Sequence, residues 1–272
     1  MTTNAGTNPS DSGSSFSRRR LLRLTGVAGA AAMASACADS AAPEPQANAT
    51  PTLVTAPTPQ SVVVPPPAPV PAPAPMSASA SLLCRDSWGA RPPRPGGRPQ
   101  TITRMTIHHT AVVLGDNSNI IDRLRQHQRY HMDDKGWIDI AYHMAVDRNG
   151  NIFQLRDWHL AGDTATSYDP YGHFLVVCEG NFDEEQVSEE QLQGAALAFA
   201  WATQQFPIST TLESHQQVAP GTSCPGANLQ DHVASEDLQR RIDALVNAGP
   251  VDLPLVCDEQ AAERVAAIEA GS

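Results

Sequence analysis

The chain has 272 residues, with 18 Lys and Arg against 29 Asp and Glu and a formal net charge of −11 at pH 7. Phosphates repel a protein of this charge, which excludes nucleic acid as a partner. No apolar run approaches the ~20 residues that cross a bilayer, so the composition also argues against a protein embedded in the membrane.

Residues 1–37 are predicted to be a twin-arginine signal peptide. Four arginines follow Ser17 and precede a short apolar stretch, Leu24–Ala36. A basic start and a short apolar region are typical of secretory signals. Paired arginines are typical of the twin-arginine type of signal. Two endings remain open: cleavage after Ala36, or a lipobox in which Cys37 is lipidated and tethers the protein to a membrane. The expected location is the periplasm or cell envelope, as an anchored lipoprotein, or outside the cell.

Residues 38–80 are predicted to be a Pro/Ala-rich disordered linker. They hold 12 of the 23 prolines, two charged residues and no aromatic residue. Such a composition favours extended polyproline-II geometry over helix or sheet. One folded domain of ordinary size is expected over residues 81–256, followed by a C-terminal tail or short helix over residues 257–272.

Hydrophobic periodicity predicts the elements of this domain. Alternating, β-branched or continuous apolar runs predict strands at Thr101–Thr110, Trp137–Val146, Asn151–Leu155 and Phe174–Cys178. Helical spacing predicts helices at Asn119–His131, Ser188–Phe206 and Glu236–Val246. Ser118 is expected to cap the first helix, and Ser188 with Gln191 to form a capping box at the second. The mixture predicts a single α/β (α+β) domain with a central mixed sheet flanked by helices.

Three side chains are candidate metal ligands. His108 and His109 end the first predicted strand, and because neighbouring strand residues face opposite sides, only one of them can face a shared site. Parity alone does not decide which. His215 and Cys224 lie nine residues apart in a turn-rich segment. Imidazole and thiolate are donors that zinc prefers, and three protein ligands leave a fourth position for water. The 107-residue gap between His108 and His215 fits no local zinc motif, however.

Of the five cysteines, Cys37 lies in the predicted signal peptide and Cys224 is a candidate ligand. The other three allow at most one intramolecular disulfide. Cys84 opens the predicted domain and Cys257 follows it, so these two could join its ends in an oxidising compartment. Free thiols at both positions remain the alternative, because the sequence does not contain the geometry. Cys178 lies in an apolar run and is expected to be a buried thiol.

A series of motifs occurs in a fixed order along the domain. The motifs are Ser87–Arg91, Ile107–Thr110, Gln128–His143, Asp147–Phe153, Ala161–Gly162, Glu179–Phe182 and Cys224–Gly226. In this order they resemble the zinc-dependent N-acetylmuramoyl-L-alanine amidases, a family that includes phage amidases and animal peptidoglycan recognition proteins. The resemblance spans nearly all of residues 84–229, and it implies the fold of that family.

The resemblance also implies the site residues. The first His of the HHT motif is a ligand, so it implies Zn²⁺ held by His108, His215 and Cys224. It implies catalytic roles for Tyr142, beside the zinc water, and for Thr222. A tyrosine of the core is the alternative for Tyr142.

Several positions depart from the family pattern. Ser214 and Gln216 flank His215 where Gly and Arg are usual, and the spacing from His215 to Cys224 is one residue longer. Val177 stands where some relatives carry a Glu, which favours Tyr142 for handling the proton. Binding-only members replace the Cys with Ser, so Cys224 favours an enzyme.

The resemblance therefore predicts an exported zinc amidase that cuts the bond between the lactyl group of N-acetylmuramic acid and L-alanine in peptidoglycan. The alternative is a peptidoglycan-binding module with little or no turnover. A zinc peptidase acting on protein lacks an HExxH-type motif. A monomer is expected, and stem-peptide preference is left open.

The other polar residues are expected to be structural. Glu179 is expected to serve the fold, and His131 and His143 to lie in or near the core. Four further histidines are expected on the surface: His127, His159, His173 and His232.

Overall fold

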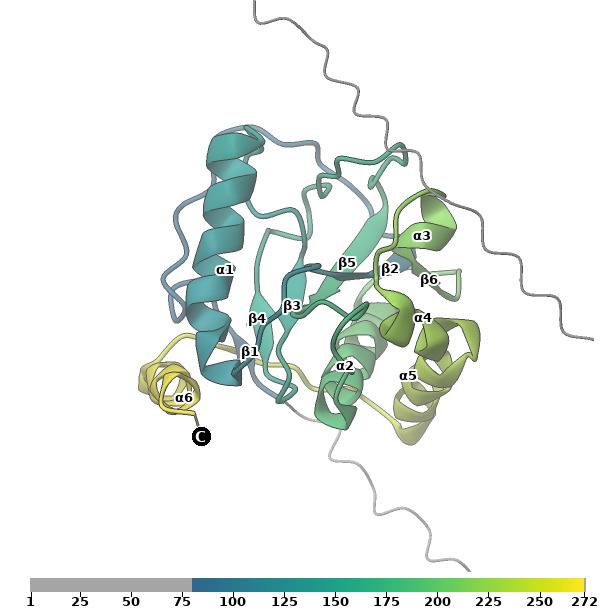
Figure 1. The fold of residues 1–272 in the computed structure, drawn as a ribbon. Helices are drawn as coiled ribbons and strands as arrows, with labels where there is room; N and C mark the ends of the chain where they lie inside the picture. The colour runs from purple at the N-terminus through teal and green to yellow at the C-terminus, as the bar shows by residue number, and fades with distance from the viewer. Residues whose placement is uncertain (1–79, 272) are drawn as a thin grey trace, which may run out of the picture. The chain divides into compact units, whose positions relative to one another are not determined.

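The computed structural model describes residues 80–271; the predicted signal peptide and nearly all of the predicted linker lie outside them. Within these residues a mixed sheet has the strand order β6-β2-β5-β3-β4-β1-β7 (Figure 1). Strands β2, β3, β5 and β6 run parallel, and β4 is antiparallel to β3. The strands are β1 Leu82–Leu83, β2 Arg104–His109, β3 Met144–Val146, β4 Ile152–Gln154, β5 His173–Cys178, β6 Leu212–Ser214 and β7 Leu255–Val256. The predicted mixed sheet is confirmed.

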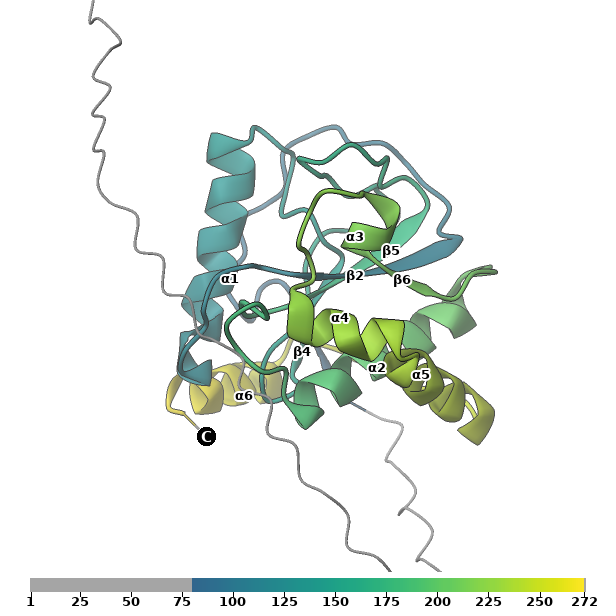
Figure 2. The ribbon, with the colours of Figure 1, turned by 45° about the vertical axis from the view of Figure 1, so that its right-hand side comes forward.

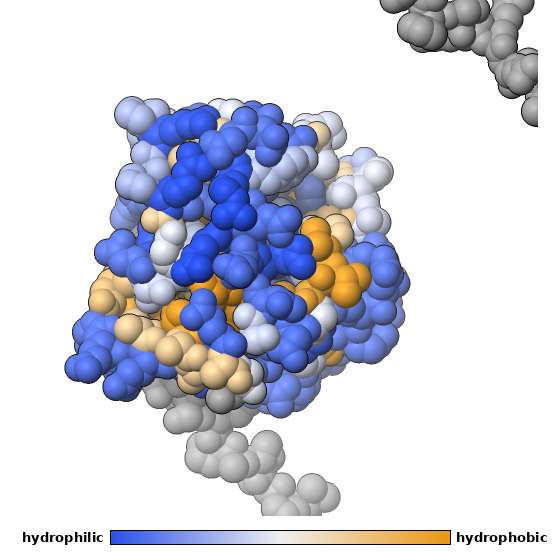
Figure 3. All heavy atoms as spheres, turned by 60° about the vertical axis from the view of Figure 1, so that its left-hand side comes forward, coloured by the Kyte–Doolittle hydropathy of each residue, from blue (hydrophilic) through white to orange (hydrophobic). Residues whose placement is uncertain are grey.

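Helices cover both faces of the sheet (Figures 1 and 2). One apolar cluster joins the sheet to α1 and α6, and a larger one joins it to α2, α4 and α5. The helices are α1 Ile120–Arg129, α2 Glu189–Gln205, α3 His215–Val218, α4 Ala227–Ala234, α5 Asp237–Ala248 and α6 Glu259–Glu269. A 3₁₀ turn, Asn117–Asn119, precedes α1 and a π-helical turn, Tyr130–Asp134, follows it. No helix of the described part is long and apolar enough to cross a membrane. The side on which α1 lies is mainly hydrophilic (Figure 3).

Of the two predicted helix caps, one is wrong and the other is confirmed in part. Asp116, not Ser118, caps the start of the first helical segment, with its carboxylate accepting from the Ser118 N–H at 2.8 Å. Ser188 caps α2 as predicted, accepting from the Gln191 N–H. The Gln191 amide does not complete the capping box, because it donates to two backbone carbonyls, those of Val146 and Glu179.

The predicted strand Trp137–Val146 forms only over its last three residues, which are β3. In the preceding residues two backbone N–H groups bond to side chains, and only the His143 N–H donates to a neighbouring strand, at the Leu175 carbonyl of β5. The Ile140 N–H donates to Asp139 at 2.8 Å, and the Ala141 N–H donates to His131 Nδ1 at 3.2 Å. The strand prediction for these residues is wrong. Their apolar pattern is that of a strand, but the pattern does not reveal that side chains take up these backbone hydrogen bonds.

A buried guanidinium fixes the same segment from the other side. Arg156 is 2% exposed and donates to the carbonyl oxygens of Ile140, Ala161 and Asp139 at 2.6–2.9 Å. It also forms an ion pair with Asp163 at 2.5 Å. These bonds satisfy carbonyl groups that no strand partner reaches, and they hold the chain just before Tyr142.

The two ends of the domain are joined by a disulfide between Cys84 and Cys257, so the pairing and not the free thiols is confirmed. Cys178 and Cys224 are buried free thiols. After Cys257, α6 packs its apolar face into the cluster around α1 through Ala261, Val265 and Ile268.

Candidate metal centre

The sheet brings His108 and His215 to one edge. His108 lies near the carboxyl end of β2, and His215 follows β6 directly. Because β2 and β6 are parallel, their carboxyl ends meet at the same edge, where open α/β sheets place their ligands.

The register settles which histidine faces the site. His108 pairs with Val177, whose side chain belongs to the apolar cluster around α1. His108 therefore faces the α1 side of the sheet. His109 faces the opposite side, where its ring lies 6.1 Å from that of Phe182. The assignment that the resemblance implied, His108 and not His109, agrees with this geometry.

Backbone contacts bring Cys224 to the same place. The Gln216 N–H donates to the Cys224 carbonyl at 2.8 Å, which ties the Cys224 loop to the first turn of α3. The His109 N–H donates to Cys224 Sγ at 3.4 Å. Gly226 has a φ of +85°, and a Cβ there would lie 2.7 Å from the backbone of Phe182. Only glycine lets this loop pack so closely.

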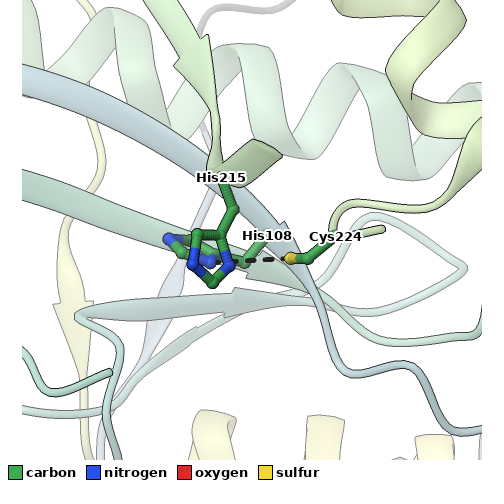
Figure 4. Close-up of side chains that lie close together, drawn as sticks. All are labelled: His108, His215 and Cys224. Atoms are coloured by element: carbon green, nitrogen blue, oxygen red, sulfur yellow. Dashed lines mark hydrogen bonds between the residues drawn. The ribbon is translucent and has the colours of Figure 1, made fainter. Parts of the chain in front are cut away.

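The three candidate ligands converge (Figure 4). Their donor atoms all lie within 4.8 Å of one another, and His108 Nδ1 is 3.7 Å from Cys224 Sγ. Two ligands of a tetrahedral Zn²⁺, with Zn–N near 2.0 Å and Zn–S near 2.3 Å, are separated by roughly 3.5 Å. Each side chain is at most 8% exposed. The donor set and its spacing therefore fit one such ion.

Hydroxyl groups lie against the outer nitrogens of both imidazoles. Thr166 Oγ1 is 2.8 Å from His215 Nε2, and the Tyr168 hydroxyl is 3.5 Å from His108 Nε2. Such partners orient metal-binding imidazoles and leave the inner nitrogen free to bind. Sequence reasoning missed Thr166 and Tyr168, because they lie in a loop without periodicity and only the fold brings them to the histidines.

Burial sets the protonation of the three candidate ligands. It lowers the pKa of His108 well below its ordinary value, helped by the neighbouring His215, and it lowers the pKa of His215 to about 4. Both imidazoles are therefore neutral at pH 7, as a metal requires. Burial raises the pKa of Cys224 to about 12, against the opposing hydrogen bond from the His109 N–H. Binding of a metal must therefore displace the thiol proton.

Tyr142 and Thr222 line the same cavity of about 290 Å³ as the three candidate ligands. The Tyr142 ring centroid is 5.0 Å from that of His108. Burial raises the pKa of Tyr142, so its hydroxyl stays protonated and can donate. Thr222 Oγ1 accepts from the Cys224 N–H at 3.2 Å, which leaves its own proton free.

Two histidines lie elsewhere than the sequence suggested. His173 is 3% exposed and 2.6 Å from the Thr106 hydroxyl, so the expectation of a surface position is wrong. His127 is half-buried, with Nε2 at 3.2 Å from the carboxylate of Glu179. In both cases a polar partner on a distant segment makes burial possible.

Acid is expected to destabilise the fold through buried histidines. Burial lowers the pKa values of His131 and His143 to about 3, whereas an unfolded histidine titrates near 6.5. Below pH 6.5 the unfolded chain binds protons that the folded chain does not, so stability falls as pH falls from 6.5 towards 3. Between pH 7 and 5 each histidine should remove about 2 kcal/mol from the free energy of unfolding.

Urea unfolding of wild type and His143→Gln at both pH values measures this effect. The variant should lose less stability on acidification, while the exposed control His159→Gln should behave as wild type. An equal loss in wild type and His143→Gln would show that His143 does not contribute.

The fold and the site together define a mixed α/β domain with a candidate His–His–Cys metal site in a surface cavity. Residues 98–227 match the sequence family "N-acetylmuramoyl-L-alanine amidase", which confirms the resemblance over this segment. Peptidoglycan-recognition protein SC2 of Drosophila melanogaster is 27% identical over 157 residues, which are 56% of this chain and 84% of that protein. The human N-acetylmuramoyl-L-alanine amidase is 30% identical over 158 residues, but these are 54% of this chain and only 26% of the human protein.

Solved structures agree with this assignment. Drosophila PGRP-LB is 27% identical with a TM-score of 0.52, over 58% of this chain and 94% of that chain. Peptidoglycan recognition protein-LE, solved in complex with tracheal cytotoxin, a monomeric diaminopimelic acid-type peptidoglycan, is 26% identical with a TM-score of 0.53. That match covers 57% of this chain and 93% of the other. The relatives thus include proteins named for recognition and proteins named for hydrolysis.

Proposed function

We propose that this domain is a zinc-dependent N-acetylmuramoyl-L-alanine amidase. It hydrolyses the amide bond between the lactyl group of N-acetylmuramic acid and L-alanine of the stem peptide. The observation that carries the proposal is the convergence of His108, His215 and Cys224 in one cavity. These three residues would hold the zinc ion, and three protein ligands leave a fourth position for water.

Zinc, when bound by these three ligands, supplies an activated water and polarises the scissile carbonyl. The chain's own residues do the rest. The protonated hydroxyl of Tyr142 donates to the oxygen that becomes negative as the carbonyl carbon is attacked, and Thr222, which lines the same cavity, is a second donor. Hydrolysis adds one water molecule across the amide bond. The carbonyl carbon of the lactyl group gains the oxygen of water, and the nitrogen of L-alanine leaves with a proton as the C–N bond breaks.

A peptidoglycan-binding module without turnover is the second candidate. Several relatives are named as recognition proteins, and Ser214 and Gln216 depart from the family pattern next to a ligand. The Ser214 N–H donates to Gln217 Oε1 at 2.7 Å at the start of α3, a backbone hydrogen bond that glycine would also make. Cys224, with both imidazoles at metal-binding distance, favours turnover over binding alone.

Stem-peptide release from purified peptidoglycan, followed by mass spectrometry, tests the proposal. We expect free peptides that begin with L-alanine, loss of this product with a chelator, and its return when Zn²⁺ is restored. Binding to peptidoglycan without any released peptide, at full zinc occupancy, would support the recognition module in its place.

Thr166 is expected to tune the affinity for zinc. Thr166→Val keeps the shape of the side chain but removes the oxygen at 2.8 Å from His215 Nε2. Loss of such a partner typically weakens metal binding 10- to 100-fold. Competition with a zinc chelator measures the change, and Ser167→Ala, which removes an exposed hydroxyl from the same loop, serves as the control. Equal zinc affinity in Thr166→Val and wild type would contradict this role.

We also propose that the protein acts outside the cytoplasm, on the cell wall. The arginine-rich motif after Ser17 and the disulfide between Cys84 and Cys257 support this location, because disulfides persist in oxidising compartments. Lipidation of Cys37 would add a membrane tether, and mass analysis of the exported protein separates a lipidated from a simply cleaved form.

A further inference from the structure

A second pair of polar side chains lies beside the candidate metal centre. Glu179 follows β5 directly, two residues after Val177, and β5 is parallel to the strand that carries His108. Its carboxylate oxygen Oε2 is 3.2 Å from Nε2 of His127 on α1. The pair therefore connects the end of a central strand to α1.

The burial of Glu179 is unusual for a residue that only supports the fold. Its side chain is 1% exposed, and its other oxygen, Oε1, is buried without a partner among the described protein groups. A carboxylate without compensation is strongly disfavoured in such surroundings. The imidazole of His127, with 13% of its side chain exposed, is the group placed to compensate it.

His127 reaches a cavity that adjoins the metal centre. This cavity of about 400 Å³ shares Thr110, His131 and Tyr142 with the one that contains the candidate ligands. Since Nε2 of His127 is directed to Glu179, Nδ1 is the nitrogen left to exchange a proton with the cavity. Water in a space of this size can carry a proton between Nδ1 and the reacting groups.

We propose that His127 and Glu179 form a proton-relay pair that delivers the proton needed by the departing amine of L-alanine. This inference rests on the proposed amidase function. As the amide C–N bond breaks, the electron pair stays on nitrogen, which takes up a proton passed on from the His127 imidazolium. The attacking water gives up a proton in forming the new C–O bond, and this proton restores the imidazolium. Glu179, which contacts Nε2 of His127, orients the imidazole and stabilises its positive charge.

The surroundings of His127 are mixed in charge. Glu179 is the acidic group against it, from the end of β5. The other titratable or charged side chains around this cavity come from α1, the turn after it and the segment before β3: Arg123, Tyr130, His131 and Tyr142. The guanidinium of Arg123 is directed away, to Gln126 Oε1 and to the carbonyl of Val113. Among the described residues that line this cavity or contact the imidazole, Glu179 is therefore the acidic group.

The test uses the zinc-loaded protein and three variants. His127→Gln keeps a donor for Glu179 but cannot carry a proton, so kcat for stem-peptide release should fall about 100-fold, in the range of one acid–base group, with KM and zinc content unchanged. Glu179→Gln should move the alkaline limb of the kcat profile to lower pH, because the imidazolium loses its counter-charge. Gln126→Ala, on the wall of the same cavity, should match wild type.

Chemical rescue separates a relay from a structural role. Imidazole added to His127→Ala should restore part of kcat, increasingly as the concentration of protonated imidazole rises. A His127→Gln variant with wild-type kcat and pH profile would overturn the relay, as would a loss of kcat explained by lost zinc or unfolding. A wild type that is loaded with zinc but releases no peptide would overturn the amidase function and the relay together.

Discussion

Cys224→Ser should release no stem peptide and should still fold. The serine hydroxyl is a far weaker zinc ligand than a thiolate, and the two imidazoles that remain do not complete the site. We expect release to fall to the level of the chelator-treated wild type, with zinc content well below one ion per chain. The fold should persist because Sγ is a small part of the core, and its hydrogen bond from the His109 N–H can pass to the hydroxyl.

Mass spectrometry of released peptides, metal analysis and thermal unfolding together measure this variant. The exposed neighbour Ser223→Ala is the matched control and should keep full activity. Release by Cys224→Ser at the wild-type rate would contradict the role of the thiolate.

Arg156→Met should be the most destabilising substitution outside the apolar core. It leaves three carbonyl oxygens, those of Asp139, Ile140 and Ala161, without their donor, and Asp163 without its ion pair. Each buried group left unsatisfied costs about 1–3 kcal/mol. We therefore expect a loss of roughly 3–6 kcal/mol in the free energy of unfolding, a large share of the stability of a domain of this size.

Urea denaturation measures this loss, and Arg98→Met provides the comparison. Arg98 forms its ion pair with Asp169 at the surface, with 53% of its side chain exposed, so the same substitution there should change stability by no more than about 1 kcal/mol. Similar losses in the two variants would show that the carbonyl contacts of Arg156 contribute little.

The sequence was a good guide to elements whose side chains pack in a simple period. The strand Phe174–Cys178 and the helices Ser188–Phe206 and Glu236–Val246 lie where predicted, within a residue or two at their ends. Their apolar stripes face a single layer, so the pattern and the packing agree. Residue types alone marked His215, Cys224 and one of the two neighbouring histidines as candidates, and the resemblance selected His108. The separation of 107 positions between His108 and His215 is bridged by sheet pairing, which the sequence does not display.

Other features depended on contacts that leave no periodic signal. The segment before β3 has the apolar alternation of a strand, yet Asp139, His131 and Arg156 bond its backbone. The pairing of His127 with Glu179 joins residues 52 positions apart, and each looks ordinary on its own in the sequence. Polar partners from distant segments therefore account for most of what sequence reasoning missed.

X-ray absorption at the zinc edge of the purified, zinc-loaded domain tests the central claim most directly. The account predicts one Zn²⁺ per chain with two nitrogen ligands at about 2.0–2.1 Å and one sulfur at about 2.3 Å, and loss of the sulfur signal in Cys224→Ser. A chain that is active without bound metal, or a zinc ion with no sulfur neighbour, would contradict it.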